Sequence, residues 1–255
     1  MNRLVTALPE WQKELLRKVR DLVFSVLYTG SSRYCPVCRK YSSKFRSYGD
    51  SSYGDSSREG SVCVHCNSLE RHRLVWLFFA TKTDLFEQKP IKFLHVAPER
   101  SFVPRLKKLL SRGKYITADL YDSRATVKMD ITNIDFAGES FDAIYCSHVL
   151  EHVQDDRKAL GEFYRVLKNN GWAVFMVPIT EEKTYEDPSI TDPQERKKAF
   201  GQEDHVRCYG KDFIDRLKEA GFKVTVAKAE DFCSEDEIVQ MGLLKHEEIY
   251  YCTKK

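Results

Sequence analysis

The sequence predicts an α/β protein built on a doubly wound, mostly parallel sheet. From Ile91 onward, short runs of β-branched and aromatic residues alternate with helix-like patterns, which is the order of a sheet with crossover helices. The runs at 91–96 and 141–146 are mostly apolar and each stops at a polar turn, as buried parallel strands do. Ligands bind beyond the carboxyl ends of such strands. The polar residues that follow the strands are therefore the first candidates for function.

Composition narrows the class of protein. The chain has 255 residues, of which 42% are hydrophobic and 31% charged, and its formal net charge of +3 does not by itself indicate a nucleic-acid-binding protein. Apolar runs such as 74–80 are too short for a membrane span, and the first residues lack the apolar core of a secretory signal. Four of the eight cysteines form two CxxC pairs, which favours a reducing compartment. We therefore expect a cytoplasmic protein without a transmembrane segment.

Residues 9–28, within an N-terminal segment of residues 1–30, are predicted to form an amphipathic helix. Leucines and valines recur at helical spacing, and the basic residues fall largely on other faces. We expect the apolar face to pack on the rest of the protein. A basic amphipathic helix also suits a membrane surface or a nucleic acid, and these stay as alternatives. The apolar positions are Leu15, Leu16, Val19, Leu22, Val23, Val26 and Leu27.

Residues 31–68 carry four cysteines with the spacing of a metal site. Cys35 and Cys38 form one CxxC pair, and Cys63 and Cys66 form the other. Each pair makes a tight turn that brings two sulfurs to one ion, and four thiolates suit tetrahedral zinc. We predict a closed, structural zinc ribbon rather than a redox or disulfide site. A tandem repeat over 48–57, rich in Ser, Gly and Asp, cannot form a core and is expected at a flexible tip loop of the ribbon.

A mainly apolar helix over about 69–82, in a connecting segment of residues 69–90, should follow the ribbon. Ser68 is a suitable N-cap residue for this helix. Arg71, His72 and Arg73 lie in its first turn. They could bind an anionic substrate or only form salt bridges at the helix start, and the sequence leaves both readings open.

Residues 91–255 are expected to form the sheet domain. The loop at 178–210 is longer than a plain connection and rich in acidic, histidine, arginine and tyrosine side chains, which predicts a lid over a substrate. The expected strands are 91–96, 115–118, 126–129, 141–146, 171–177, 222–228 and 247–253, and the expected helices are 101–112, 155–168 and 211–220.

A series of short motifs follows along this domain: Leu94-His95-Val96-Ala97-Pro98-Glu99, Ala118-Asp119-Leu120, Met129-Asp130-Ile131-Thr132, Ser140-Phe141-Asp142, Ser147-His148-Val149-Leu150-Glu151-His152-Val153 and residues 165–172. In this order the motifs resemble class I S-adenosylmethionine-dependent methyltransferases of the type 11 kind, and most of all those with an N-terminal CxxC zinc segment. The resemblance covers about residues 91–253. It implies a Rossmann-like sheet of seven strands, S-adenosylmethionine as cofactor and methyl transfer as the reaction.

The resemblance also implies which residues contact the cofactor. Asp119 would hold the ribose hydroxyls, because one carboxylate can accept both hydroxyl protons. Asp130 and Ile131 would flank the adenine, while Ser147 and His148 would lie beside the methionine moiety and the methyl group. The implied cofactor-binding residues are Ala97, Pro98, Glu99, Asp119, Leu120, Asp130, Ile131, Ser147 and His148.

The first loop departs from the family pattern. Family members usually have glycines there, because the backbone must approach the cofactor closely. Ala97, Pro98 and Glu99 stand at these positions, and His95 stands where an acidic residue is usual. We expect Glu99 to bind the ammonium group of the cofactor in this variant, with Arg100 near its carboxylate.

Catalysis of methyl transfer requires the acceptor atom to be held in line, in some cases beside a base. His148 is the first candidate base, and His152 could share the role. In the lid segment His205, Arg207 and Tyr209 alternate, so an extended chain would place all three on one side. His205 is the other candidate base, and Arg207 and Tyr209 would orient the acceptor. A salt-bridged surface loop is the alternative.

The predicted function is transfer of a methyl group to an oxygen or nitrogen of a small polar or anionic metabolite, such as a sugar. An RNA or protein methyltransferase that uses the zinc ribbon for recognition is one alternative. Nucleic acid is the less favoured partner, because the ribbon lacks an interleaved basic and aromatic surface. A zinc-stabilised binding protein whose methyltransferase fold has lost its cofactor is the other. The sequence does not indicate the oligomeric state.

Overall fold

The computed structural model describes residues 9–48, 58–87 and 89–254. The chain divides into two compact units, which we call the N-terminal unit (residues 1–83 and 228–247) and the sheet unit (residues 84–227 and 248–255). The domain boundaries expected from the sequence divide the chain differently, because residues 228–247 group with the N-terminal unit and not with the sheet.

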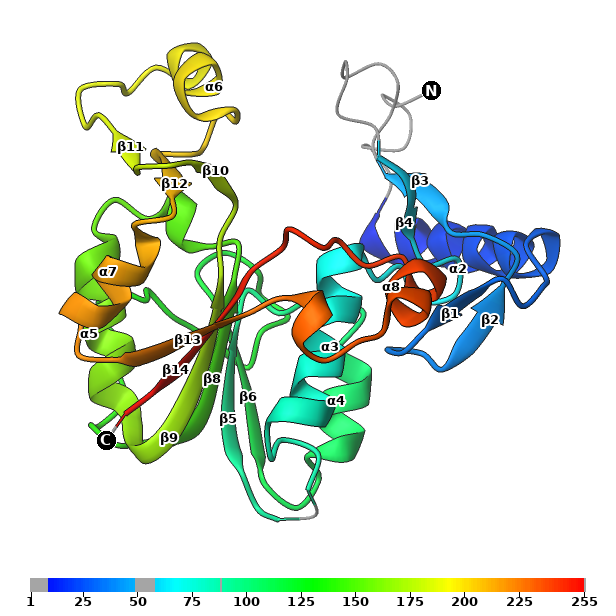
Figure 1. Ribbon diagram of the computed structural model, residues 1–255, viewed down its shortest axis with the longest axis horizontal. Helices are drawn as coiled ribbons and strands as arrows, with labels where there is room; N and C mark the ends of the chain where they lie inside the picture. Colours follow the sequence, from blue (N-terminus) through cyan, green and yellow to red (C-terminus); the bar gives the residue numbers. More distant parts are fainter. Residues whose placement is uncertain (1–8, 49–57, 88, 255) are drawn as a thin grey trace. The chain divides into compact units, whose positions relative to one another are not determined.

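The sheet unit is built on seven strands in the order β13-β14-β9-β8-β5-β6-β7. β14 is antiparallel to both of its neighbours, and the other six strands run in one direction. Helices α5 and α7 cover one face and α4 lies on the other (Figure 1). The predicted α/β class and all seven predicted strands are confirmed. The strands are β5 (Lys92–Val96), β6 (Lys114–Asp119), β7 (Val127–Lys128), β8 (Phe141–Ser147), β9 (Leu167–Met176), β13 (Lys223–Ala227) and β14 (Ile249–Thr253).

The core of this unit forms where the strands meet the helices. Leu94, Ile144 and Phe175 come from three neighbouring strands and are completely buried, as is Phe163 of α5. Each such side chain stabilises the fold by about 1.5–3 kcal/mol through burial. The Asp155 side chain accepts a hydrogen bond from the amide of Lys158 and caps α5. The helices are α4 (Val103–Leu109), the short 3-10 helix η2 (Leu150–His152), α5 (Asp156–Val166) and α7 (Phe213–Glu219).

The junction between α5 and β9 differs from its predicted position. The helix ends at Val166 rather than 168, and β9 begins at once. Its first residues are accommodated by an irregular register against β8, and Asn170 adopts a left-handed φ of 62°. A Cβ on Gly171 would lie 2.9 Å from the carbonyl oxygen of Asp142. The sequence pattern could not reveal this crowding, so the predicted strand began too late.

The segment predicted to be a lid, residues 178–210, has regular secondary structure of its own. Between β9 and α7 the chain forms a three-stranded sheet in the order β10-β12-β11 and one helix, α6 (Figure 1). The Asp192 carboxylate accepts hydrogen bonds from the first amides of α6, and Gly201 ends it with a φ of 85°. The elements are β10 (Ile179–Glu181), β11 (Tyr185–Glu186), α6 (Pro193–Phe200) and β12 (Arg207–Gly210).

The N-terminal unit consists of two small two-stranded antiparallel sheets and several helices. The described part of the predicted tip loop ends at Tyr48, and residues 49–57 of the tandem repeat lie outside the described residues. The elements are α2 (Glu10–Leu27), β1 (Arg33–Cys35), β2 (Lys40–Ser42), β3 (Arg46–Tyr48), β4 (Arg58–Val62), α3 (Glu70–Lys82), the 3-10 helix η3 (Ala229–Asp231) and α8 (Glu235–Met241).

Helix α2 packs in the opposite sense to the prediction. Its polar and aromatic side holds it to the hairpins: the Asn67 amide donates to the Asp21 carboxylate at 2.7 Å, and the Arg46 guanidinium lies 4.8 Å from the centre of the Phe24 ring. The seven apolar positions of the stripe are between 48% and 68% exposed. The described residues of the N-terminal unit therefore leave this stripe exposed, contrary to the expectation that it packs on the protein. No helix among the described residues is long and apolar enough to cross a membrane.

Candidate active site at the carboxyl edge of the sheet

The carboxyl ends of three neighbouring strands bring several predicted site residues to one edge. Val96 of β5 pairs with Ala118 of β6 on one side and with Cys146 of β8 on the other. The residues that follow these positions, Ala97, Asp119 and Ser147, therefore lie at the same rim. Topology alone produces this convergence, as expected for parallel strands that start in register.

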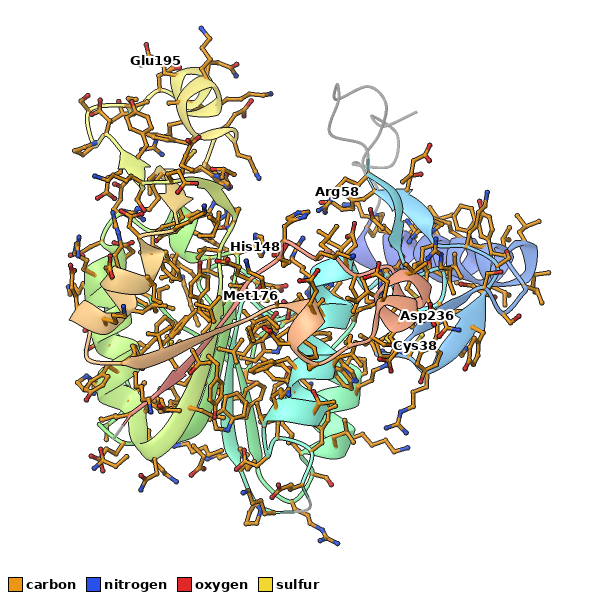
Figure 2. The ribbon with its side chains drawn as sticks, viewed as in Figure 1. Cys38, Arg58, His148, Met176, Glu195 and Asp236 are labelled. Carbon is orange, nitrogen blue, oxygen red and sulfur yellow. The ribbon has the colours of Figure 1, made fainter. Side chains whose placement is uncertain are left out.

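Two residues at this rim have strained backbones. Ala97 has a φ of 47° and His148 a φ of 52°, in the left-handed region that side chains with a Cβ avoid at a cost of about 1–3 kcal/mol. Each is fixed by a backbone hydrogen bond to the next strand, Ala97 to the Ala118 carbonyl at 2.8 Å and His148 to the Met176 carbonyl at 2.9 Å. Figure 2 shows His148 and Met176 close together at this end of the sheet. The loop after β5 thus makes a glycine-type turn without glycine.

The Glu99 side chain, which follows this turn, is held by hydrogen bonds from residues of the neighbouring strands. His95, completely buried in β5, donates from Nε2 to the Glu99 carboxylate at 2.5 Å, and the Tyr145 hydroxyl donates to its other oxygen at 2.9 Å. The Tyr115 hydroxyl lies 2.8 Å from His95 Nδ1, and burial together with the nearby Glu99 charge raises the pKa of Tyr115. Both carboxylate oxygens of Glu99 therefore already have protein partners, and His95 serves to position the loop.

Asp119 and Asp130 each cap a turn with one oxygen. Oδ1 of Asp119 accepts hydrogen bonds from the amides of Tyr121 and Asp122 at 2.7 and 2.8 Å, and Oδ1 of Asp130 accepts from the amide and hydroxyl of Thr132, both at 2.8 Å. The Oδ2 atoms make no hydrogen bond within the described part of the chain. Both carboxylates are thus oriented by the backbone while keeping an acceptor for a ligand. Of the neighbouring apolar residues, Leu120 is 37% exposed and Ile131 is buried.

Ser147 provides a test of whether this rim fits a ligand. Its side chain is 7% exposed and its Oγ atom is buried without a hydrogen-bond partner among the described residues. Buried hydroxyls usually have a partner, because an unpaired one costs about 1–3 kcal/mol. A polar group of a bound molecule would satisfy it. Together with the turn at Ala97 and the oriented Asp119, this atom fits a cofactor with hydroxyl and amino groups.

Beyond β8, three histidines and two carboxylates form a cluster. His148 Nδ1 lies 3.3 Å from Oε1 of Glu151, and His152 Nδ1 lies 3.2 Å from Oδ2 of Asp204. His205 Nδ1 donates to the Phe200 carbonyl at 3.2 Å. Burial, followed by the charge of His152, lowers the pKa of His205. The sequence pointed to the histidines but not to Glu151, which is 1% exposed; only its position between two histidines could have signalled it.

Arg207 and Tyr209 lie in a buried network that holds the lid. Arg207 donates to the carbonyls of Leu150, Val153 and Gln154 at 2.8, 2.5 and 2.8 Å. The Tyr209 hydroxyl donates to Asp156 at 2.6 Å, and burial, with the Asp156 charge next, raises its pKa.

Two further charged residues complete this network, and the sequence did not single them out for it. Arg216 contacts Asp156 at 2.8 Å and Glu186 at 2.9 Å. Burial raises the pKa of Glu186, but the hydrogen bonds from Arg216 and Arg207 outweigh it and hold that pKa at about 2. All of the polar atoms of Arg207 and Tyr209 described above face protein partners. Their predicted role in orienting an acceptor stays a prediction, and the contacts favour a positioning role.

The four cysteines of the N-terminal unit converge. Their sulfurs all lie within 4.8 Å of one another; Cys35 is 3.6 Å from Cys66, and Cys38 is 3.7 Å from Cys63. Four thiolates on one zinc with bonds of about 2.3 Å stand about 3.8 Å apart, so the set fits this ion.

Two residues near the cysteines have structural roles that differ from those considered for them. The Ser68 hydroxyl lies 3.2 Å from the sulfurs of both Cys35 and Cys66, and α3 begins only at Glu70, so Ser68 is not its N-cap. Arg73 is completely buried and donates to the carbonyls of Ser61, Ser68, Met241 and Gly242. It therefore supports the ribbon instead of binding a substrate.

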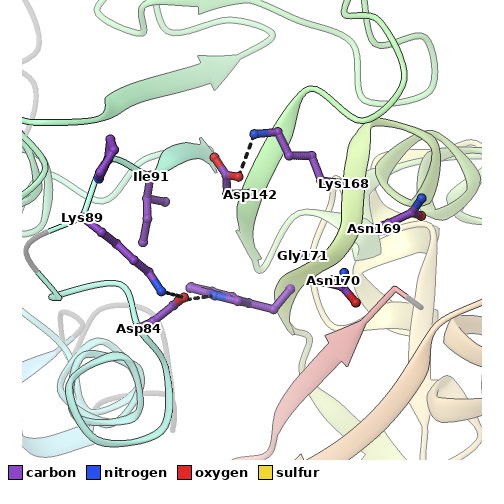
Figure 3. A pocket seen from close by; sticks show the side chains of 10 residues that line it. Asp84, Lys89, Ile91, Asp142, Lys168, Asn169, Asn170 and Gly171 are labelled. Atoms are coloured by element: carbon purple, nitrogen blue, oxygen red, sulfur yellow. Dashed lines mark hydrogen bonds and ion pairs between the residues drawn. The ribbon is translucent and has the colours of Figure 1, made fainter.

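A separate pocket of about 310 Å³ lies at the opposite, amino-terminal edge of the sheet (Figure 3). Asp84 accepts hydrogen bonds from Lys89 and from Trp172 Nε1 at 2.6 and 2.8 Å, and Lys168 pairs with Asp142 at 2.7 Å. None of the predicted site residues lines this pocket. The charged side chains of this pocket pair with one another or with Trp172, which is consistent with a structural role.

Comparison with known proteins gives a family match for part of the sheet unit. Residues 84–175 match the family described as methyltransferase domain. The chain is 32% identical over 124 residues to a sterol 24-C-methyltransferase of Eremothecium gossypii, a match that covers 46% of this chain and 32% of the relative. The chain thus spans about a third of the length of this curated relative.

Solved structures give further similarities. An S-adenosylmethionine-dependent methyltransferase of Mesorhizobium loti is 13% identical, with 70% of this chain and 96% of that chain covered and a TM-score of 0.48. The 1,6-didemethyltoxoflavin-N1-methyltransferase of Burkholderia thailandensis is 12% identical, with 71% and 76% covered and a TM-score of 0.46. The match to the methyltransferase domain family confirms the resemblance predicted from the sequence for residues 84–175 of the chain.

Proposed function

We propose that the protein transfers the methyl group of S-adenosylmethionine to an oxygen or nitrogen atom of a small polar or anionic acceptor. The observation that carries this proposal is the convergence at one rim of the left-handed turn at Ala97, the oriented carboxylate of Asp119 and the unpaired hydroxyl of Ser147. The strained turn and the unpaired hydroxyl each cost free energy, and Asp119 keeps one carboxylate oxygen for a ligand after capping its turn with the other. Together they suit the polar groups of the cofactor.

In this proposal different residues of the rim bind different parts of the cofactor. The free oxygen of Asp119 accepts from the ribose hydroxyls, with Leu120 beside the ring. Asp130 and Ile131 flank the adenine, and Ser147 with the loop at 97–99 holds the methionine end. Because Glu99 is already bonded to His95 and Tyr145, its carboxylate contributes charge near the ammonium group in addition to fixing the loop.

His148 is the proposed base. The cofactor supplies an electrophilic methyl group, and the acceptor must lose a proton when its oxygen or nitrogen forms the new bond to carbon. Oε1 of Glu151 lies 3.3 Å from His148 Nδ1, so the Glu151 carboxylate orients the ring and Nε2 is the nitrogen that takes the proton in this proposal. The strained backbone of His148 and its bond to Met176 fix the ring position. His205 belongs to a cluster with Glu151 and His152 and is not proposed as the base.

The lid forms the wall of the acceptor site in this proposal. Arg207 holds the 150–154 turn and Tyr209 holds Asp156, so both act as positioning residues rather than catalytic ones. The amide of Val206 donates to the Glu151 carbonyl at 2.9 Å, which couples the lid to the turn that carries His148 and His152. Motion of the lid would therefore change the position of the base.

The cysteine cluster is proposed to hold one structural zinc ion. Its sulfur–sulfur distances suit a tetrahedral site, and four protein thiolates leave no open position for chemistry. In this role the metal stabilises the N-terminal unit and takes no part in methyl transfer. The alternative role of that unit is to recognise RNA or protein, and an acceptor screen that includes RNA tests the RNA case.

Calorimetric titration with S-adenosylhomocysteine tests cofactor binding directly. We expect one binding event per chain, a clear loss in Asp119→Ala, and no change in Asp236→Asn, whose exposed carboxylate lies in the N-terminal unit. Absence of binding by the natural chain would support the alternative of a binding protein that has lost its cofactor. An acceptor screen with labelled S-adenosylmethionine, run over small metabolites and over RNA, then separates the substrate classes; salt-sensitive retention and labelling of RNA would favour the nucleic-acid alternative.

A further inference from the structure

A second group of potential metal ligands lies in the sheet unit. One carboxylate oxygen of Glu151 and one ring nitrogen each of His152 and His205 lie within 4.8 Å of one another. Two imidazoles and one carboxylate are a donor set that divalent first-row transition metals accept, with positions left open for other ligands. We propose that Glu151, His152 and His205 bind one divalent transition metal ion beside the methyl-transfer site.

The distances require only small adjustments. Donors on one ion with bonds of about 2.0–2.2 Å stand about 3–4 Å apart, slightly closer than the limit of 4.8 Å. His152 can supply the movement, since its side chain is 34% exposed. The ring planes of His152 and His205 are already at 84° with centroids 4.7 Å apart, so each ring can aim a nitrogen at a shared point without the other blocking it.

The Nδ1 atoms of both histidines have protein partners, so Nε2 of each ring is the proposed metal ligand. His205 Nδ1 faces the Phe200 carbonyl at 3.2 Å, and because a carbonyl only accepts, Nδ1 carries the proton and Nε2 keeps its lone pair. His152 Nδ1 faces the Asp204 carboxylate at 3.2 Å, which has the same consequence. Metal-binding histidines usually show this pattern, with the distal N–H bonded to a carbonyl or carboxylate that fixes the tautomer.

Glu151 gives an independent indication of a cation. The residue is 1% exposed, and one oxygen lies 3.3 Å from His148 Nδ1. Its other oxygen, Oε2, is buried without a hydrogen-bond partner within the described part of the chain. A buried carboxylate oxygen without a partner is costly unless it is protonated or bound to a cation. One ring nitrogen each of His152 and His205 lies within 4.8 Å of a Glu151 carboxylate oxygen, close enough for one cation to bridge the three side chains.

Three protein ligands leave open positions on the ion. Resting on the proposed function, we infer that these positions take an oxygen of the acceptor, such as a carboxylate or one of two adjacent hydroxyls, and so hold it near His148. The metal would also fix Glu151, and through it the orientation of the His148 ring. The acceptor class is therefore an oxygen-rich molecule able to bind a metal ion.

The test measures metal binding on the full chain with its cysteine site loaded with zinc. Mn²⁺ is titrated and followed by loss of the electron paramagnetic resonance signal of the free ion, and Co²⁺ is titrated by calorimetry. Mn²⁺ is useful because it prefers oxygen and nitrogen ligands over thiolates. We expect one site per chain, weakened at least about 10-fold in Glu151→Gln and in His205→Ala.

His246→Ala serves as the matched control, because His246 is an exposed histidine of the N-terminal unit, and its variant should bind as the natural chain does. Circular dichroism of each variant verifies that it is folded. If neither Mn²⁺ nor Co²⁺ binds the natural chain, or if both Glu151→Gln and His205→Ala bind with unchanged affinity, the proposal is overturned. These outcomes do not depend on methyl transfer, so they are separate from a failure of the proposed function, which calorimetry with S-adenosylhomocysteine reports.

Discussion

The four-cysteine cluster and the Glu151/His152/His205 cluster gather ligands in different ways. The cysteines are all within reach of one ion, have sulfur–sulfur distances that match a tetrahedron, and are buried or half-buried. In the second cluster Glu151 and His205 are buried while the His152 side chain is 34% exposed. A closed set of four suits a structural ion, and an open set of three suits an ion that also binds a substrate.

The difference extends to what surrounds each cluster. Arg73 binds four backbone carbonyls around the cysteines and so holds the segments of the N-terminal unit together. Around Glu151 the contacts come from residues 200–207 and from the turn that carries His148, and the His152 side chain beside it is 34% exposed. We infer that rigidity near the cysteines serves stability and that adaptability near Glu151 serves chemistry, and four measurements sharpen or break this contrast.

The largest effect is expected from Cys35→Ser. Structural zinc contributes about 10–16 kcal/mol of apparent binding free energy in small zinc domains, so loss of one thiolate should release the metal and unfold the N-terminal unit. Metal analysis and thermal melting measure this. Cys233→Ser, a free cysteine outside the cluster, is the control. Stoichiometric zinc retained by Cys35→Ser would mean that the four sulfurs do not act as one site.

Asp156→Ala should have the next largest effect. It leaves Arg216 and the Tyr209 hydroxyl without their buried partner, and removal of one member of a buried ion pair costs about 3–5 kcal/mol. Denaturant unfolding gives the free energy. Asp215→Ala, whose side chain is 64% exposed, should change it little. Equal values for both variants would show that the lid network does not contribute to stability.

Removal of metal should separate the two clusters. A weak chelator added to the fully loaded protein is expected to extract the ion at Glu151 first, because an open site exchanges faster than a closed one. At a free metal concentration of 100 times the dissociation constant, the lost stabilisation is about 2.7 kcal/mol. Differential scanning calorimetry before and after chelation measures it. Simultaneous loss of both ions would contradict the contrast drawn above.

Acid should loosen the lid by a smaller amount. The pKa of Glu186 is held at about 2, below the usual value of about 4.3 for an unfolded chain. Its stabilising contribution is thus fully present above about pH 4.3 and is lost as the pH falls toward 2. The effect is modest because the side chain is 39% exposed. Proteolysis within residues 178–210 as a function of pH measures it, and Glu186→Gln should remove that pH dependence.

The sequence predicted the sheet well for a physical reason. Buried strands must be apolar over several residues, so the runs that contain Leu94 and Ile144 are visible without a structure. The cysteines were equally clear, because CxxC spacing has few other uses in a reducing compartment.

The sequence could not predict which partners the functional candidate side chains contact. The alternation of Arg207 and Tyr209 indicated that they share a side, but it could not indicate that Arg207 contacts the 150–154 turn or that Tyr209 contacts Asp156. The stripe on α2 was recognised, yet nothing in its spacing says that Asp21 and Phe24 hold the helix and leave the leucines outward. Glu151 went unnoticed because burial of a carboxylate depends on contacts distant in sequence.

The backbone at Ala97 has a consequence for recognising distant relatives. A turn and the residue that usually forms it are separate properties, and here Ala97 adopts a left-handed φ of 47° that is more typical of glycine. Chains without glycine at this position can therefore adopt a left-handed turn when a backbone hydrogen bond to a neighbouring strand holds the peptide. Screening for left-handed torsions just past the first strand, rather than for glycine itself, would retain such proteins.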